Sequence, residues 1–217
     1  QGVRPTGLYI PRFRNVGTQD DDADFVRGFG YQAQTIRPDW QSTFNAKGFG
    51  ADYKNALAKP EPFWIWGMGS FVECLPQENN RVTLHGTKKD RFGVPLLDTE
   101  FTWGTNERKI AQDTGVQAEK IMRAAGAIGF TISGADDMTD GGAGVHEMGT
   151  ARMGDDPMQS VLNKYNQTHE IDNLFVTDGS FMTSASCVNP SLTYMAFTAR
   201  ACDYAVQQLK DGKIGVT

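Results

Sequence analysis

The chain has 217 residues and a formal charge of −5, with 39% hydrophobic and 22% charged residues. This length suffices for one ordinary domain or two small ones with a buried core. The acidic balance argues against nucleic acid or an anionic membrane surface as a partner, and no apolar run approaches the ~18 residues of a membrane span. Three scattered cysteines without a C-x-x-C pattern predict neither a disulfide framework nor a zinc site.

The first quarter of the chain has mixed character. Its acidic run, residues 20–24, is most simply a solvated loop. Residues 25–36 read as a strand in which Gly28 and Gly30 imitate a dinucleotide-binding G-x-G-x-x-A pattern. Because no clean strand precedes these glycines and Pro38 follows soon after, glycines in a bent strand are the better interpretation.

Residues 52–58 fit a short helix, after which the pattern turns to β structure. Three aromatic-rich segments, PFWIWGMGSFVECL, RVTLHG and LLDTEFTW, predict an antiparallel sheet with turns at 76–80 and 90–93. Its aromatic side chains can line a ligand pocket or simply form core, and the pattern alone does not decide between them. A helix with an apolar stripe is predicted over 106–127, followed by a glycine-rich loop over 133–144.

The stretch 145–205 has the features of a catalytic site. His146 lies in the glycine-punctuated segment VHEMGTARMG. An apolar strand predicted at 174–177 ends directly in Asp178 and Gly179, at the loop position where α/β proteins hold ligands.

A long helix is predicted to follow, with Asn189 as its N-cap, Pro190 in the first helical position and an end near Gly212. Its apolar face comprises Leu192, Met195, Ala196, Ala199, Cys202, Val206 and Leu209. The unpaired N–H groups and partial positive charge of a helix N-terminus suit an anion or an electron-rich ring edge.

These segments resemble the C-terminal part of the glucose–methanol–choline (GMC) oxidoreductases, which are FAD-dependent enzymes acting on alcohols and sugars. The matching pieces are HEMGTARMGDDP and NLFVTDGSFMTSASCVNPSLTYMAFTAR, in the family's order and spacing. Upstream, ECLPQENNRVTLHGTKKDRFGVPLLDTEF resembles the family's substrate-domain hairpin, and RPTGLYIPRFRN and FVRGFGYQ resemble the substrate domain of its bacterial sugar-dehydrogenase branch. The resemblance covers roughly residues 72–208.

The resemblance implies an α+β fold in two parts. Residues 1–140 would form a substrate-binding domain of antiparallel sheet plus helices. Residues 141–217 would form the C-terminal segment of the FAD-binding domain, an incomplete Rossmann-like β-α piece that carries the active site. Because the chain has no convincing G-x-G-x-x-G unit, the ADP half of FAD is expected on an N-terminal segment missing from it. The isolated fragment is therefore expected to bind FAD poorly and to be inactive.

The activity implied is oxidation of a CH–OH group of a sugar or polyol by hydride transfer to FAD. His146 would be the base for the hydroxyl proton, a role that suits a neutral imidazole titrating near working pH. Asn189 matches the position where family members place a second His or an Asn, and would hydrogen-bond the substrate oxygen.

The cofactor-binding residues implied by the resemblance flank the start of the long helix. Asp178 and Gly179 match positions near the FAD pyrophosphate and ribityl chain. Asn189, Pro190 and Thr193 match positions at the pyrimidine end of the flavin ring. A helix N-terminus there would stabilise negative charge on the reduced flavin.

Other polar residues receive structural interpretations. His85 and His169 are expected to be surface residues rather than ligands, and Arg152 pairs either with Glu147 or with the cofactor. An EF-hand-like spacing of acidic residues has Met138 at a ligand position, so no metal site is predicted.

The alternative function is a non-catalytic carbohydrate-binding β module. Such a module would use aromatic side chains of the predicted sheet, namely Phe63, Trp64, Trp66 and Trp103. It has no need for the set His146, Asp178 and Asn189, which favours the oxidoreductase. A non-redox lyase on the same scaffold is a third, minor option.

The predicted partners are a sugar or alcohol substrate and the N-terminal FAD-binding half. Since the chain looks more like a dehydrogenase than an oxidase, an electron-acceptor protein or a quinone is also expected. The sequence does not predict the substrate's identity, the oligomeric state, or whether the bacterial compartment is periplasmic or cytoplasmic.

Overall fold

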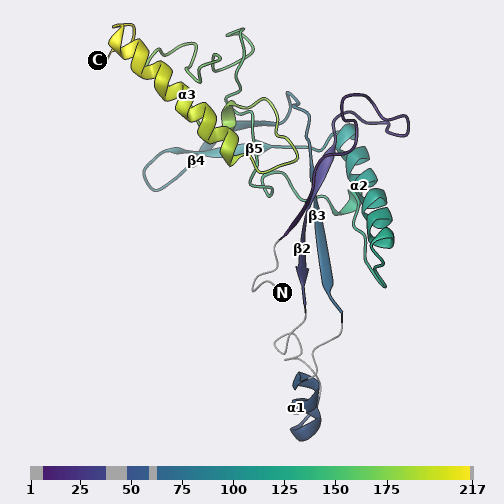
Figure 1. Ribbon diagram of the computed structural model, residues 1–217. Coiled ribbons are helices and arrows are strands. Elements are labelled where there is room, and N and C mark those ends of the chain that lie inside the picture. Colours follow the sequence, from purple (N-terminus) through teal and green to yellow (C-terminus); the bar gives the residue numbers. More distant parts are fainter. Residues whose placement is uncertain (1–6, 38–47, 59–62, 216–217) are drawn as a thin grey trace.

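The computed structural model describes residues 7–37, 48–58 and 63–215. Its main sheet is antiparallel and has the order β1-β2-β3 (Figure 1). The strands are β1 (Leu8–Ile10), β2 (Phe29–Ile36) and β3 (Ile65–Val72). Strands β2 and β3 pair along their whole length, from Phe29 opposite Val72 to Ile36 opposite Ile65. Gly30 therefore lies inside a strand, as that interpretation predicts, whereas Gly28 lies just before β2.

A second, two-stranded sheet consists of β4 (Arg81–Lys89) and β5 (Pro95–Glu100). Its turn is stabilised by Asp90, whose Oδ1 accepts hydrogen bonds from two backbone N–H groups at 2.8 and 2.9 Å. The prediction of one sheet from the three aromatic-rich segments is therefore wrong. The first segment pairs with β2 instead, because alternation specifies which face of a strand is buried but not which strand is its partner.

Helix α2 (Thr105–Ala124) packs against one face of the β1-β2-β3 sheet. Ile110 is fully buried against Phe29 and Tyr31, and the Tyr31 hydroxyl donates to the Thr114 carbonyl at 2.6 Å. The predicted helix is confirmed, although it ends at Ala124, just before Gly126 adopts a φ of 79°. Helix α1 (Gly50–Ala58), also predicted, contains no buried residue.

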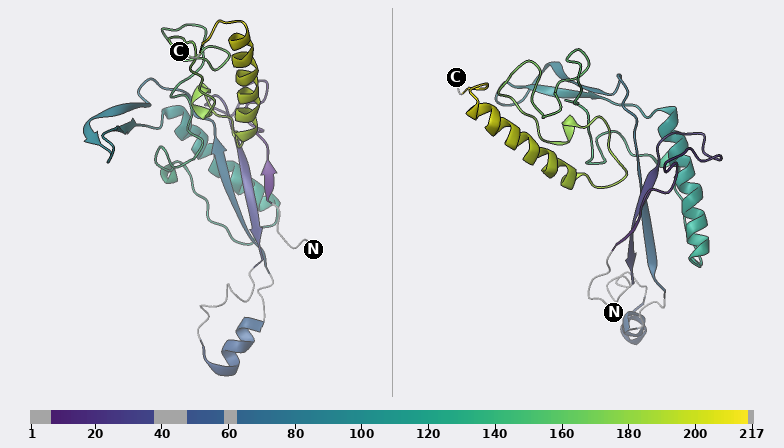
Figure 2. Two further views of the ribbon diagram at one scale, coloured as in Figure 1. Left: turned by 90° about the vertical axis from the view of Figure 1, so that its left-hand side faces the viewer. Right: turned by 45° about the horizontal axis from the view of Figure 1, so that its top comes forward.

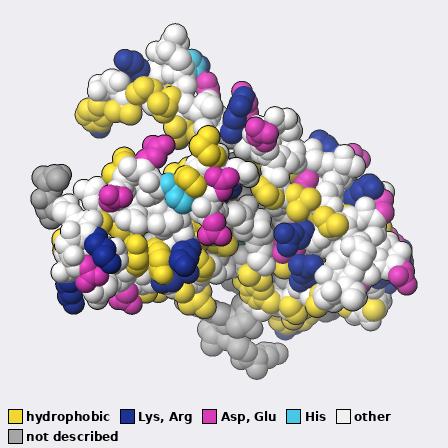
Figure 3. All heavy atoms as spheres, turned by 90° about the horizontal axis from the view of Figure 1, so that it is seen from above, with side chains coloured by type: hydrophobic (Ala, Val, Ile, Leu, Met, Phe, Trp, Pro, Cys, Tyr) yellow, Lys and Arg dark blue, Asp and Glu magenta, His cyan; other side chains and the backbone are white. Residues whose placement is uncertain are grey.

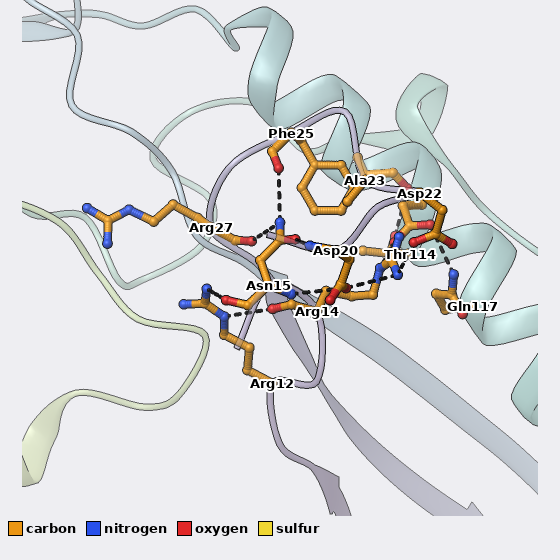
Figure 4. Close-up of polar contacts among 12 residues, drawn as sticks. Arg12, Arg14, Asn15, Asp20, Asp22, Ala23, Phe25, Arg27, Thr114 and Gln117 are labelled. Carbon is orange, nitrogen blue, oxygen red and sulfur yellow. Dashed lines mark hydrogen bonds and ion pairs between the residues drawn. The ribbon is translucent and has the colours of Figure 1, made fainter. Parts of the chain in front are cut away.

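The loop between β1 and β2 is built around a buried arginine (Figure 4). Arg14 is only 8% exposed and forms ion pairs with Asp20, Asp22 and Asp113 at 2.8–3.0 Å. A buried cation requires such partners, because desolvation without them is very unfavourable. The acidic run is a largely exposed loop, as predicted, but Asp20 and Asp22 in it also neutralise Arg14. Beside it, Asn15 donates to the carbonyls of two later loop residues at 2.9 Å.

The rest of the chain is largely irregular before helix α3 (Ser191–Lys210), with short 3-10 turns η1 (Ala135–Asp137) and η2 (Gly179–Phe181) (Figure 2). The strand predicted at 174–177 does not form. This segment is extended and makes an antiparallel bridge at Phe175 with Gln167. On this side the Thr168 N–H donates to the Leu174 carbonyl and the Val176 N–H donates to the Asn166 carbonyl, at 3.0 and 2.9 Å.

Helix α3 packs through a face that the sequence pattern did not single out. Phe197 stacks on the buried Phe181 at a centroid distance of 4.8 Å, and Tyr204 stacks on Tyr165 at 3.9 Å. The predicted apolar face is largely exposed instead, with Leu192 78% and Met195 68% exposed. The helix has apolar residues on two faces, and the aromatic one makes the contacts. Figure 3 shows hydrophobic side chains gathered in several groups on the outer surface.

The ends of α3 differ in how well they were predicted. The helix stops at Lys210, and Gly212 adopts a φ of 66°, as the pattern predicted. Asn189 is not the N-cap: Pro190 occupies that position, and no side chain caps the helix. The mixed fold of antiparallel sheets and helices is confirmed. None of the helices in the described part of the chain combines the length and apolarity that crossing a bilayer requires.

Candidate active site

Two of the predicted motifs lie side by side. The Ala151 N–H donates to the Ser180 carbonyl at 3.0 Å, and the Met153 N–H donates to the Phe181 carbonyl at 2.9 Å. Gly149 has a φ of 89°, and a Cβ added there would lie 3.4 Å from the next carbonyl of the facing segment. These contacts bring the histidine motif alongside the turn that precedes α3.

His146 lies half-buried beside the main sheet. Its ring centroid is 5.6 Å from that of Phe71, the residue of β3 next to the strand's end. Within the described residues, neither ring nitrogen of His146 has a hydrogen-bond partner. Both nitrogens therefore remain available to a ligand.

Asn189, which lies just before α3, contacts the same sheet. Its Nδ2 donates to the hydroxyl of Tyr9 in β1 at 2.9 Å, joining residues 180 apart. One residue further back, the loop lies against the sheet: a Cβ added to Gly30 would be 3.4 Å from the Cys187 carbonyl oxygen. The side chain that was expected to cap α3 instead anchors this loop on the sheet.

The strand register places both contacts on one sheet face. Gly30 lies opposite Phe71, and in the next row Gln32 lies opposite both Tyr9 and Gly69. Adjacent rows on a face are separated by two residues, about 7 Å. The His146 and Asn189 contacts therefore occupy neighbouring rows at one end of the face that points away from α2.

The turn before α3 is closely packed. Asp178 accepts a hydrogen bond from the Ser180 N–H at 2.9 Å and another from the Ser180 hydroxyl. Gly179 is buried, and a Cβ placed there would lie 2.5 Å from the Tyr194 hydroxyl oxygen. Burial, with the charges of Asp178 and Glu147, raises the pKa of Tyr194.

The N-terminus of α3 is chemically suited to an electron-rich ligand. No side chain caps it, so the first-turn N–H groups, including that of Thr193, have no side-chain acceptor. Pro190 is buried, whereas Asn189 is exposed. The donor set of this helix end therefore fits the pyrimidine edge of a flavin, which presents carbonyl oxygens and a ring nitrogen.

The remaining polar residues have local partners. His169 Nε2 lies 3.0 Å from the Ser160 hydroxyl and 3.2 Å from a backbone carbonyl, and His85 accepts two backbone N–H groups within β4. Glu147 accepts from the Gly144 N–H at 3.1 Å. Within the described ranges, Arg152 and Glu147 form no ion pair.

The aromatic side chains of the alternative function do not form one exposed platform. The indole nitrogen of Trp66 is buried, and the register puts this side chain on the α2 side of the sheet, opposite Thr35. Trp103 packs edge-on against Phe101 and donates to the Thr139 carbonyl at 2.9 Å. Two of the four residues are thus occupied by intramolecular packing.

Sequence reasoning missed Tyr9 and Gln32. Neither belongs to a recognisable motif, and the sheet that contains them forms between segments distant in the sequence. The alternation of β2, which buries Phe29, Tyr31 and Ala33, assigns Gln32 to the other face. Only the folded structure shows that His146 and Asn189 contact that face.

Comparison with known proteins finds related sequences over most of the chain. The family profile described as GMC oxidoreductase matches residues 76–198. Over 97% of its length the chain is 34% identical to the 2-methyl-1,2-propanediol dehydrogenase of Mycolicibacterium austroafricanum, of which it covers 38%. It is 35% identical over 64% of its length to the fructose dehydrogenase large subunit of Gluconobacter japonicus, covering 25% of that protein. It is also 35% identical over 58% of its length to the paromamine 6'-oxidase of Streptomyces fradiae, covering 23%. The chain thus spans at most 38% of the length of these three relatives.

Proposed function

Because the chain belongs to the family of GMC oxidoreductases, we propose that it forms the substrate-binding and active-site part of an FAD-dependent dehydrogenase that oxidises a CH–OH group of a sugar or polyol. The observation that carries this proposal is that His146 and Asn189 contact the same sheet face in neighbouring rows, His146 through Phe71 on β3 and Asn189 through Tyr9 on β1. The names of the relatives, which include a diol dehydrogenase and a fructose dehydrogenase, favour a hydroxylated substrate.

His146 acts as the general base in this proposal. Its ring nitrogens have no partner among the described residues, so a neutral imidazole can accept the proton of the substrate hydroxyl. Phe71, beside the ring, restricts the positions that the imidazole can adopt. Asn189 holds the substrate oxygen, while its own amide is oriented by Tyr9. A proton acceptor and an oxygen-binding group then lie at the same end of the sheet face.

The proposed cofactor site is the turn and helix start at 178–193. Thr193 and Pro190 would lie at the pyrimidine end of FAD, and Asp178 and Gly179 near its pyrophosphate and ribityl chain. When bound, FAD supplies the acceptor for the hydride that leaves the carbinol carbon. The uncapped first turn of α3 would stabilise the negative charge that follows.

The ADP half of FAD belongs, in this proposal, to another segment of a longer enzyme. Residues 1–140 are then the substrate-binding domain and residues 141–217 the returning part of the FAD-binding domain. The much greater length of the relatives supports this division. The exposed apolar face of α3, which includes Leu192 and Met195, is the surface that such a segment would cover. Electrons would pass onward to an acceptor protein or a quinone.

The first experiment is the anaerobic absorption spectrum of the full-length protein, recorded before and after addition of a panel of sugars and alcohols. We expect a flavin band that bleaches with at least one of them. His146→Ala should lower the rate of bleaching by roughly 10²–10⁴-fold, as expected for loss of a general base.

The matched control is His85→Ala, which removes a histidine that only bonds backbone within β4. It should leave the rate unchanged. A His146→Ala protein with full activity would remove His146 from the mechanism, and a purified full-length protein without flavin would refute the proposal as a whole.

A further inference from the structure

The sheet face that carries the candidate site continues beyond it as a groove. The groove has a volume of about 580 Å³, within the range of pockets that hold ligands larger than a single ring. Its lining includes residues of all three strands of the main sheet, among them Tyr9, Gln32, Gln34, Ile36, Ile65 and Gly67. Tyr9 belongs both to this lining and to the hydrogen bond with Asn189, so the groove opens directly onto the site.

Glycines give the groove its depth. Gly67 and Gly69 occupy two successive positions on this face of β3, opposite Gln34 and Gln32. A Cβ added to Gly67 would meet no atom within 4 Å, and one added to Gly69 would meet a carbonyl oxygen of β2 at 3.9 Å. The space above them is therefore open, and it exists because β3 has no side chains there.

The groove also presents unsatisfied polar groups. The Gln32 Nε2 is buried and, among the described residues, has no hydrogen-bond partner. A buried amide without a partner is unfavourable, so a ligand oxygen that reached this group would gain a hydrogen bond. Gln34 lies exposed in the next row, and the Tyr9 hydroxyl, which accepts from Asn189, keeps its own proton to donate. At the far end, Ile36 and Ile65 are 59% and 54% exposed and offer an apolar surface.

The length of the groove exceeds one sugar ring. Along β2, the groove runs from the row of Gln32, opposite Tyr9, to the row of Ile36, opposite Ile65. At about 3.3 Å per residue, these rows are roughly 13 Å apart. A ligand whose reacting hydroxyl is held near Asn189 therefore leaves the Gln34, Gly67 and isoleucine rows to a second group.

We propose that this groove binds the second ring or aglycone of an extended glycoside, whose reacting ring lies at the Tyr9–Asn189 end. The proposal rests on the proposed function and specifies its substrate class. Gln32 and Gln34 donate to oxygens of the second group, and Ile36 and Ile65 contact its apolar end. Tyr9 is a positioning residue that orients Asn189.

The test uses the full-length flavoprotein and pairs of probes that differ only beyond the reacting ring, such as methyl and 4-nitrophenyl glucosides, and glucose and maltose. In the wild type, the longer member of a productive pair should have the lower KM. Gly67→Val, whose Cβ would meet no atom within 4 Å, should raise that KM by about tenfold or more, the effect of losing one or two good contacts. The KM of the short member and the kcat of both should stay within a factor of two or so.

Three further variants complete the design. Gln34→Ala, a surface change that should not disturb folding, should raise the KM of the long member alone. Gly86→Val in β4 is the matched control, because Gly86 is also an open strand glycine but does not line the groove. Tyr9→Phe should instead lower kcat for both members by up to about tenfold, because it disorders Asn189 rather than the groove.

The outcomes separate this inference from the proposed function. Equal effects of Gly67→Val on both members of each pair, or no effect on either, would overturn the groove assignment even in an active flavoenzyme. If neither these probes nor the panel of sugars and alcohols bleaches the flavin, the proposed function fails, and calorimetric binding of the long probes then tests the groove by itself. Binding that Gly67→Val abolishes supports the groove; absent or unaltered binding overturns it.

Discussion

Gly179, in the candidate cofactor site, lies very close to the ring of Tyr194, and this contact predicts how much a substitution there lowers the free energy of unfolding. A Cβ at position 179 would lie 2.5 Å from the Tyr194 hydroxyl oxygen and 2.8 Å from its Cζ, whereas carbon contacts are favourable at roughly 3.5–4.0 Å. Such overpacking costs about 1–3 kcal/mol. Because Gly179 has no left-handed φ, the alanine also restricts the unfolded chain, which offsets about 0.4–1 kcal/mol. We therefore expect Gly179→Ala to destabilise the protein by roughly 0.5–2 kcal/mol.

A double-mutant cycle isolates this contact. Tyr194→Leu removes every atom that the new methyl group would strike, so in that background Gly179→Ala should be neutral or slightly stabilising. The assay is urea unfolding of the four proteins followed by far-UV circular dichroism, compared at equal denaturant slopes. The same destabilisation by Gly179→Ala in both backgrounds would refute the close-packing explanation and leave the glycine's role to the cofactor.

Two other predictions follow from buried acidic residues. Burial, and then the charge of Glu107, raises the pKa of Cys74 to about 11, so near pH 8 its thiolate is about a hundredfold scarcer than at the ordinary value. Glu107→Gln should speed its alkylation by iodoacetamide, measured by mass spectrometry, and an unchanged rate would contradict this cause. Glu73→Ala deprives Arg12 and a backbone N–H of their shared acceptor, which should destabilise the protein by about 1–3 kcal/mol in urea unfolding. Glu100→Ala, in an exposed pair, should destabilise by less than about 1 kcal/mol, and equal shifts would argue against a buried role for Glu73.

The elements that the sequence predicted well are those determined by neighbouring residues. The stripe of α2, the stop of α3 before Gly212 and the Asp90 turn all depend on contacts within a few residues. The pairing of β2 with β3 and the burial of Arg14 do not. Their partners come from distant segments, and alternation or charge alone does not identify them.

For the candidate site, motifs located the residues but not their surroundings. His146 and Asn189 were found because they stand in recognisable segments, while Tyr9 stands in none. Asn189 also illustrates a competing interaction: its side chain could either cap α3 or reach the sheet, and the hydrogen bond to Tyr9 takes it. The apolar face predicted for α3 is exposed in the described structure, and the helix packs instead through Phe197 and Tyr204, whose partners the sequence pattern does not identify.

The hydrogen bond between Tyr9 and Asn189 has a consequence for the order of folding. Arg14 and Asp113 join residues 99 apart, and Tyr31 and Thr114 join residues 83 apart, so the first part of the chain can close once α2 has been synthesised. Tyr9 must wait for a partner 180 residues later. Loop closure over that distance is entropically the least favourable of these steps. During synthesis on the ribosome, the substrate sheet therefore forms early, and the junction that orients Asn189 is completed last.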